Sequence, residues 1–107
     1  MRNITASELK AYLERTDQAP PVLVDVREPW EFQICHIENS KHIPMSDLQR
    51  VVNEFDPAQE LVLICHHGVR SQRAGMMLAQ VGFGNLVNLV GGINAWAREV
   101  DPNMPTY

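Results

Sequence analysis

The fold is decided by the stretch Leu61-Val62-Leu63-Ile64-Cys65-His66-His67-Gly68-Val69-Arg70-Ser71. Its first five residues form a short and wholly apolar run, which is typical of a strand covered on both faces in a parallel sheet. A tight turn containing Gly68 follows. A helical period then predicts one apolar face, made of Ala74, Met77, Leu78 and Val81, and Gly82 is a good C-terminal stop. The stretch therefore predicts a buried strand, a tight loop and a helix.

Similar patterns occur on either side of this stretch. The sequence Thr5-Ala6-Ser7-Glu8 is a capping box, and it predicts a helix that ends before Ala19-Pro20-Pro21. A second box, Ser46-Asp47-Leu48-Gln49, predicts another helix that ends at Asp56-Pro57. Further strands and a last helix are expected at Val22–Val26, Leu86–Val90 and Ile93–Val100. The segment from Arg27 to Pro44, with breaks at its prolines, reads as irregular chain folded over the core.

Strands that alternate with helices predict right-handed crossovers and a parallel sheet with helices on both faces. The chain has 107 residues, of which 45% are hydrophobic and 21% charged, and this suits one globular α/β domain spanning residues 1–107. Its net charge of −4 argues against nucleic acid as a partner. No apolar run is long enough for a bilayer, and two cysteines are too few for a disulfide framework. We therefore expect no membrane partner and a cytoplasmic location.

Cys65 stands where an open α/β sheet places its working site, at the carboxyl end of a strand. Amides at the start of the following helix lack internal partners and would favour an anion there. Cysteine thiols in such surroundings ionise near or below neutral pH, so the loop predicts a thiolate at Cys65, with local positive charge from Arg70 and Arg73. The alternative, that Cys65 is an inert, buried hydrophobic residue, stays open on spacing alone.

Four segments, in order, resemble signatures of the rhodanese family, the thiosulfate-type sulfurtransferases. The segment Cys65–Ser71 resembles the active-site loop in its Cys-x-x-Gly-x-Arg-Ser form. The other three are Asp25-Val26-Arg27-Glu28-Pro29-Trp30-Glu31-Phe32, the pair His36-Ile37 and His42-Ile43-Pro44, and Gly91-Gly92-Ile93-Asn94-Ala95-Trp96. The resemblance runs from about Val22 to the C-terminus.

The resemblance implies a three-layer α/β/α fold with a five-stranded, mainly parallel sheet. It also implies a thiosulfate sulfurtransferase that carries sulfur as a persulfide on Cys65. The donor would be a small sulfur anion such as thiosulfate, and the acceptor would be cyanide, a low-molecular-weight thiol or a thioredoxin-like protein. No cofactor or metal is expected. The remaining loop residues would bind the anion through amides and positive charge: His66, His67, Gly68, Val69, Arg70 and Ser71.

Two departures and two alternatives accompany this resemblance. The family often has Arg or Lys after the cysteine, where this chain has His66, and Gly before His36, where this chain has Cys35. Related phosphatases have one more residue in the loop, whereas four residues separate Cys65 from Arg70 here. Besides a phosphatase, a non-catalytic module for binding or redox sensing remains an alternative.

Other polar residues are expected to be structural. Asp25 should fasten a neighbouring loop, Arg27 should pair with Glu31 or a similar acid, and His36 should be held by a hydrogen bond. Cys35 should be a buried thiol, although it could instead resolve an oxidised Cys65. Trp30 could wall the site or cover the sheet edge. Zinc ligation by the cysteines and the histidines beside them is not expected, because their spacing lacks the usual pattern.

Overall fold

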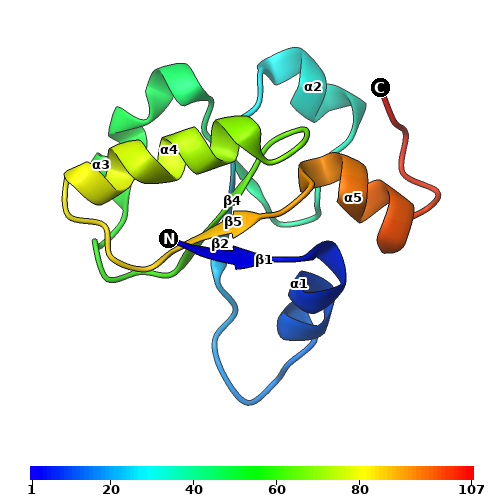
Figure 1. Ribbon diagram of the computed structural model, residues 1–107, viewed down its shortest axis with the longest axis horizontal. Coiled ribbons are helices and arrows are strands. Elements are labelled where there is room, and N and C mark those ends of the chain that lie inside the picture. The colour runs from blue at the N-terminus through cyan, green and yellow to red at the C-terminus, as the bar shows by residue number, and fades with distance from the viewer.

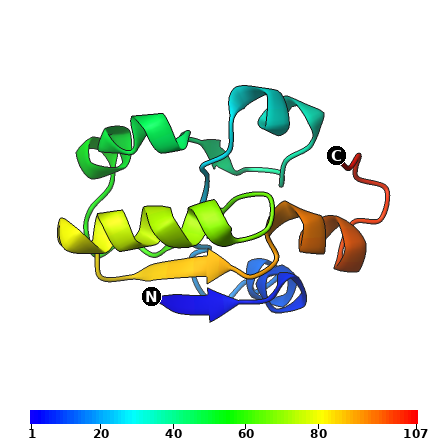
Figure 2. The same ribbon diagram turned by 45° about the horizontal axis from the view of Figure 1, so that its top comes forward.

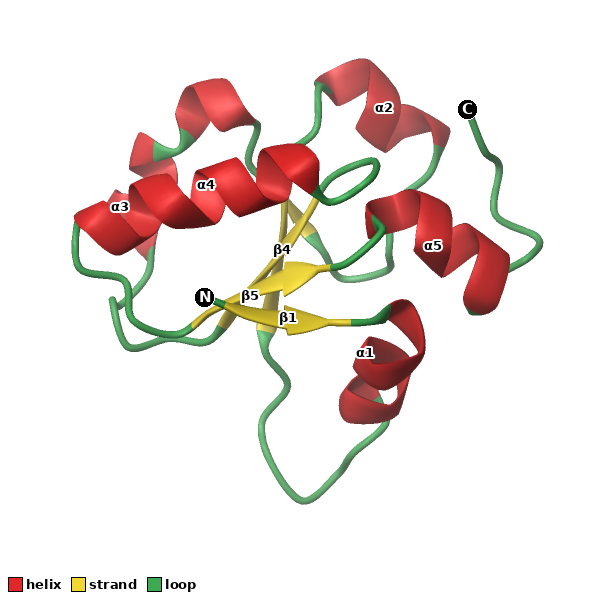
Figure 3. Ribbon diagram, viewed as in Figure 1, coloured by secondary structure: helices red, strands yellow, loops and turns green.

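Five parallel strands form one sheet in the order β1-β5-β4-β2-β3. Figures 1 and 3 show β1 beside β5. The computed structural model describes residues 1–107. The central strand, β4, is buried along its whole length, as its unbroken apolar sequence predicts. The strand bounds are β1 Arg2–Ile4, β2 Val22–Asp25, β3 Lys41–His42, β4 Leu61–Ile64 and β5 Leu86–Leu89. The predicted five-stranded α/β fold is thus confirmed, and every strand pair is parallel.

Helices cover both faces of this sheet, and each face has its own apolar core of twelve buried residues. Helices α1 (Ala6–Leu13) and α5 (Gly92–Glu99) pack on one face, where Leu9 and Ile93 meet Val62 and Ile64. Helices α3 (Gln49–Glu54) and α4 (Val69–Gln80) cover the other face, and Figure 2 shows α4 running alongside β5. None of the helices is long and apolar enough to cross a bilayer.

The register of the sheet brings the chemistry-bearing residues to one edge. Asp25 lies opposite Ile64, and Leu63 lies opposite Asn88. The carboxyl ends of β2, β4 and β5 therefore meet at the same edge, and Cys65 is the first residue beyond β4. The C-terminal tail turns back toward this edge and ends beside α2 and α5 (Figures 1 and 2).

The segment from Arg27 to Pro44 is more regular than its sequence suggests. It contains helix α2 (Pro29–Ile34) and the short strand β3. Pro29 does not break structure there, because proline suits the first position of a helix, where no amide hydrogen bond is lost. Glu28 and Glu31 form a capping box across that first turn, so the prediction of irregular chain was wrong.

Two helix predictions also need correction. Ser46 lies in a 3₁₀ turn, η1 (Met45–Asp47), and α3 begins at Gln49 without a side-chain cap, so the second capping box is wrong. On α4, Met77 and Val81 are exposed. The buried face begins three positions earlier than predicted and consists of Ser71, Ala74, Gly75 and Leu78. The capping box at Thr5, by contrast, is confirmed by both of its hydrogen bonds.

Candidate functional site

Cys65 leaves β4 into the loop at the start of α4, and its side chain is buried, with the residue 1% exposed. It lies on the α4 face of the sheet and belongs to the apolar core there. Its sulfur nevertheless has polar neighbours. The Gly68 amide donates to Cys65 Sγ at 3.0 Å, and Ser71 Oγ lies 3.3 Å from the sulfur. The sulfur thus sits between an apolar base and a polar loop.

Gly68 gives the loop its tight turn. It caps α4 with φ +95°, a left-handed conformation that side-chain-bearing residues rarely adopt. A Cβ at this position would also lie 3.2 Å from the Gly91 nitrogen and the Leu89 oxygen. Only glycine therefore lets the chain turn here while its amide points at the sulfur.

The start of α5 holds the other side of the loop. The Ile93 amide donates to the Cys65 carbonyl at 2.8 Å, and the Asn94 amide donates to the His66 carbonyl at 3.1 Å. A trans peptide directs its N–H opposite to its C=O. The amides that follow these two carbonyls, those of His66 and His67, therefore point away from α5.

The loop is rich in amides with no acceptor in the protein. The Gly68 amide donates to the sulfur of Cys65. Five other backbone amides donate to no group in the protein: those of His66, His67, Val69, Arg70 and Ser71. The last three are the first residues of α4, where helix geometry leaves amides unpaired and adds partial positive charge. The arrangement can hold an anion beside Cys65.

Asn88 of β5 completes the polar contacts of this loop. Ser71 Oγ lies 2.5 Å from Asn88 Oδ1, and Asn88 Nδ2 donates to the Gly68 carbonyl at 3.3 Å. Asn88 is buried on the same face of the sheet as Cys65. One side chain from the neighbouring strand thus contacts both ends of the Gly68–Ser71 segment.

Arg70 forms an ion pair with Glu31 of α2. Its two terminal nitrogens donate to the two carboxylate oxygens at 2.6 and 2.7 Å. These bonds, helped by the Glu28 amide and the Tyr107 hydroxyl, lower the pKa of Glu31 to about 2 although burial acts to raise it. The charge of Arg70 is therefore balanced inside the protein, and the pair ties α4 to α2.

The Arg27 guanidinium is fully buried and pairs with Asp25, with 2.7 Å between Arg27 Nη2 and Asp25 Oδ2. It also donates to the Cys35 carbonyl at 2.7 Å and to the Tyr107 hydroxyl at 2.9 Å. The expected pairing with an acid is thus found, but the acid is Asp25, and Glu31 contributes only its backbone carbonyl. Arg27 thus joins β2, the end of α2 and the C-terminal tail, which fits a structural role.

Tyr107 covers one side of the loop. Its ring stacks on His66 with 4.1 Å between ring centroids, and its hydroxyl donates to Glu31 at 2.8 Å. Burial raises the pKa of Tyr107 to about 12, and the bond to Glu31 adds to this. Burial also lowers the pKa of His66, which favours its neutral form at pH 7.

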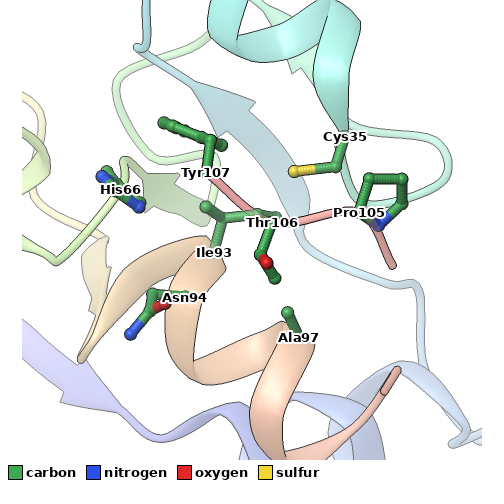
Figure 4. A pocket seen from close by; sticks show the side chains of 8 residues that line it. All are labelled: Cys35, His66, Ile93, Asn94, Ala97, Pro105, Thr106 and Tyr107. Carbon is green, nitrogen blue, oxygen red and sulfur yellow. The ribbon is translucent and has the colours of Figure 1, made fainter. Parts of the chain in front are cut away.

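A narrow pocket lies beside this stack (Figure 4). In Figure 4 the tail residues Pro105–Tyr107 form one wall and α5 forms another, with His66 on the left of the view and Cys35 on the right. Cys35 is a buried, free thiol, and its sulfur lies 4.0 Å from Arg27 Nη1. It belongs to the apolar core opposite the one that holds Cys65.

The remaining residues singled out from sequence lie around the rim. Trp30 is 58% exposed and packs edge-on against Tyr107, so it stands at the mouth of the site. His36 is exposed, and its Nδ1 lies 2.9 Å from the Phe32 carbonyl oxygen. No three side chains among His, Cys, Asp and Glu come together as a metal site.

Comparison with known proteins decides the family. The sequence model of the rhodanese-like domain family matches residues 5–99 of this chain. The chain belongs to the rhodanese-like family. A rhodanese-like domain protein from Staphylococcus aureus has the same fold, with a TM-score of 0.83 and 35% identity over 94% of this chain and 95% of that one.

Two curated relatives are longer than this rhodanese-like chain. The maize protein named adenylyltransferase and sulfurtransferase MOCS3-2 is 37% identical over 97% of this chain and 23% of its own length. The Bacillus subtilis protein named putative sulfur carrier protein YrkF is 30% identical over 92% of this chain and 54% of its own length. This chain thus spans about a quarter of the first and about half of the second.

Three residues of the site were missed by sequence reasoning: Glu31 as the partner of Arg70, Asn88, and Tyr107. Asn88 did carry a signal, since it is the one polar residue inside the apolar run Leu86–Val90. A buried amide in a strand needs hydrogen-bond partners, and these lie in the loop. Tyr107 carried no local signal, because its contacts with Arg27 and Glu31 span 80 and 76 positions of the chain.

Proposed function

We propose that residues 1–107 form a single rhodanese-like domain that acts as a sulfurtransferase, with Cys65 as its nucleophile. The observation that carries this proposal is the amide of Gly68 on Cys65 Sγ, in a loop whose five other amides have no acceptor. Such preorganised donors stabilise an anion without having to reorient during the reaction. The family match and the sulfurtransferase named among the relatives support the same chemistry.

The proposed reaction has two displacements at sulfur. The thiolate of Cys65 attacks the outer sulfur of a donor such as thiosulfate, a new S–S bond forms, and sulfite leaves with the electron pair of the old one. Cys65 then carries a persulfide, and its negative charge lies on the outer sulfur. An acceptor such as cyanide or a thiolate attacks that outer sulfur, leaves as thiocyanate or as a new persulfide, and regenerates the thiolate. No proton or external oxidant is consumed.

In this proposal the loop residues act mainly through their backbones. The amides from His66 to Ser71 would surround the persulfide, and each hydrogen bond to a charged group contributes about 1.5–3 kcal/mol. Arg70 would hold the loop in shape through its pair with Glu31. Because Cys65 is 1% exposed, the donor must displace part of the loop or its cover to reach the sulfur.

The charges around the site bear on the donor and the acceptor. Arg70 is balanced by Glu31, and His66 stands where the family often has a cation. We therefore propose that a dianion such as thiosulfate is held weakly and that the favoured acceptor is a thiol, low-molecular-weight or protein-borne. The name of the YrkF relative, a putative sulfur carrier, fits a protein acceptor. A nucleophilic thiol needs a reducing compartment, so we propose a cytoplasmic location.

The burial of Cys65 favours one second candidate, a non-catalytic binding module that uses the same fold. In that case the cysteine would serve as a core residue, and the exposed rim around Trp30 would contact a partner.

Steady-state transfer assays separate these functions. We expect turnover with a panel of sulfane donors and thiol acceptors, loss of that turnover in Cys65→Ser, and retention in the matched control Cys35→Ser. Turnover of a phosphate monoester without any sulfur transfer would support a phosphatase instead. No turnover with any donor, together with tight binding of a protein, would support the binding module.

A further inference from the structure

The hydrogen bonds around Cys65 leave little freedom to the proton of Ser71. Asn88 Nδ2 faces the Gly68 carbonyl, which can only accept, so the amide orientation of Asn88 is determined by that contact. Asn88 Oδ1 must then face Ser71 Oγ, at 2.5 Å. An amide oxygen can only accept, and therefore the single hydroxyl proton of Ser71 is donated to Asn88.

This assignment determines what Ser71 offers to the sulfur. With its proton on Asn88, Ser71 Oγ presents lone pairs to Cys65 Sγ, 3.3 Å away. A thiol satisfies this arrangement, because its S–H donates to Ser71 Oγ while the sulfur accepts from the Gly68 amide. A thiolate does not satisfy it, because two acceptors would face each other, unless Ser71 turns its proton to the sulfur and leaves the buried Asn88 oxygen unpaired.

We propose that Asn88 is a positioning residue that withholds the Ser71 proton from Cys65 and so disfavours the bare thiolate. The inference rests on the proposed role of Cys65 as nucleophile. The persulfide is not disfavoured, since its charge lies on the outer sulfur and the inner sulfur is neutral. The Asn88–Ser71 pair is therefore compatible with the thiol and with the persulfide of Cys65, and it destabilises only the thiolate.

The charged groups around Cys65 do not contribute to this effect. Arg70 of α4 is paired with Glu31 of α2, and Asp25 of β2 is paired with Arg27. The loop itself contributes His66 and His67. All of these groups are kept when Asn88 or Ser71 is changed. Their electrostatic effect on Cys65 is therefore the same in every variant and does not alter the difference between variants.

A double-mutant cycle tests the proposal. The pH midpoint of Cys65 ionisation is measured by the ultraviolet absorbance of the thiolate, in Cys35→Ala protein so that Cys65 is the one thiol. The cycle compares the parent, Asn88→Ala, Ser71→Ala and the double variant. Thermal unfolding checks that each is folded, and Asn88→Leu, which keeps the branched shape but has no acceptor, replaces Asn88→Ala if that variant unfolds.

We expect Asn88→Ala to lower the midpoint by roughly half to one pH unit, because Ser71 is then free to donate to the thiolate. In the Ser71→Ala background the same change should have no effect. A raised or unchanged midpoint in Asn88→Ala would mean that Asn88 only braces Gly68, and an equal fall in both backgrounds would mean that Ser71 is not the intermediary. Either result overturns the proposal. No donor is used, so the result is independent of whether the protein transfers sulfur.

Discussion

Glu31 controls how much positive charge the site presents to a donor. Its carboxylate, 4% exposed, takes both terminal nitrogens of Arg70. Glu31→Gln would leave Arg70 uncompensated near Cys65. We expect the KM for thiosulfate to fall roughly fivefold, with kcat little changed, because one unscreened charge now attracts the dianion. Steady-state kinetics at low salt would show this, with the exposed Glu38→Gln as control. An unchanged or higher KM would contradict this account of the charge balance.

The same carboxylate makes stability depend on pH. Its pKa of about 2 in the folded protein lies below the ordinary value of 4.5 for a glutamate, so the unfolded chain binds its proton first as pH falls. The stabilisation, about 3 kcal/mol, is complete above pH ~4.5 and is lost as pH falls toward 2. Urea unfolding at pH 6 and pH 3 should show a smaller drop for Glu31→Gln than for the parent protein. An equal drop in both would assign the acid sensitivity to other groups.

At the scale of elements, the start of α5 shapes the loop after β4. Gly92 has φ +58°, and a Cβ there would lie 2.3 Å from the Cys65 carbonyl oxygen. Gly92→Ala should therefore lower the free energy of unfolding by at least about 3 kcal/mol and abolish transfer, because strain and overlap both act on the loop. Urea unfolding and a transfer assay would measure the two effects.

Gly82 offers a matched control for that change. It also has a left-handed conformation, φ +102°, but a Cβ there would meet nothing within 4 Å. Gly82→Ala should cost only about 1–2 kcal/mol and leave transfer intact. Equal effects at the two glycines would show that conformation alone, and not contact with the loop, explains the role of Gly92.

The elements with strong local signals could be predicted from sequence, and those with weak ones could not. The apolar run of β4 and the capping box of α1 predicted both elements, because burial and capping act within a few residues. The strand β1 went unpredicted, since its three residues depend on pairing with β5 at the far end of the chain. Helix α2 was missed because Pro29 was interpreted as a break and not as a helix start.

The sheet of the whole molecule has one central strand and two short edge strands. Local stability should therefore be highest in the central strand and lower at the edges. β4 pairs with β2 and β5, whereas β1 pairs with β5 alone. Hydrogen exchange should therefore be slowest at Val62–Ile64, where opening requires global unfolding, and much faster at Arg2–Ile4. Equal protection of the two strands, measured by nuclear magnetic resonance, would contradict this ranking.

The part of the candidate site that lies in one short stretch of sequence was predictable, and the part assembled from distant stretches was not. Cys65, Gly68 and the start of α4 lie in one short stretch, so local geometry predicts their arrangement. The side chains that contact Arg70, Ser71 and His66 come from distant parts of the chain: Glu31 from α2, Asn88 from β5 and Tyr107 from the C-terminal tail. Only the folded sheet brings these residues together.

The central claim, that Cys65 carries sulfur, is tested most directly by intact-protein mass spectrometry after incubation with a sulfane donor and removal of the excess. The account predicts a gain of one sulfur atom per chain in the parent and in Cys35→Ser, absent in Cys65→Ser and reversed by a thiol acceptor. A chain that gains no sulfur from any donor, or gains it equally in Cys65→Ser, would contradict the account.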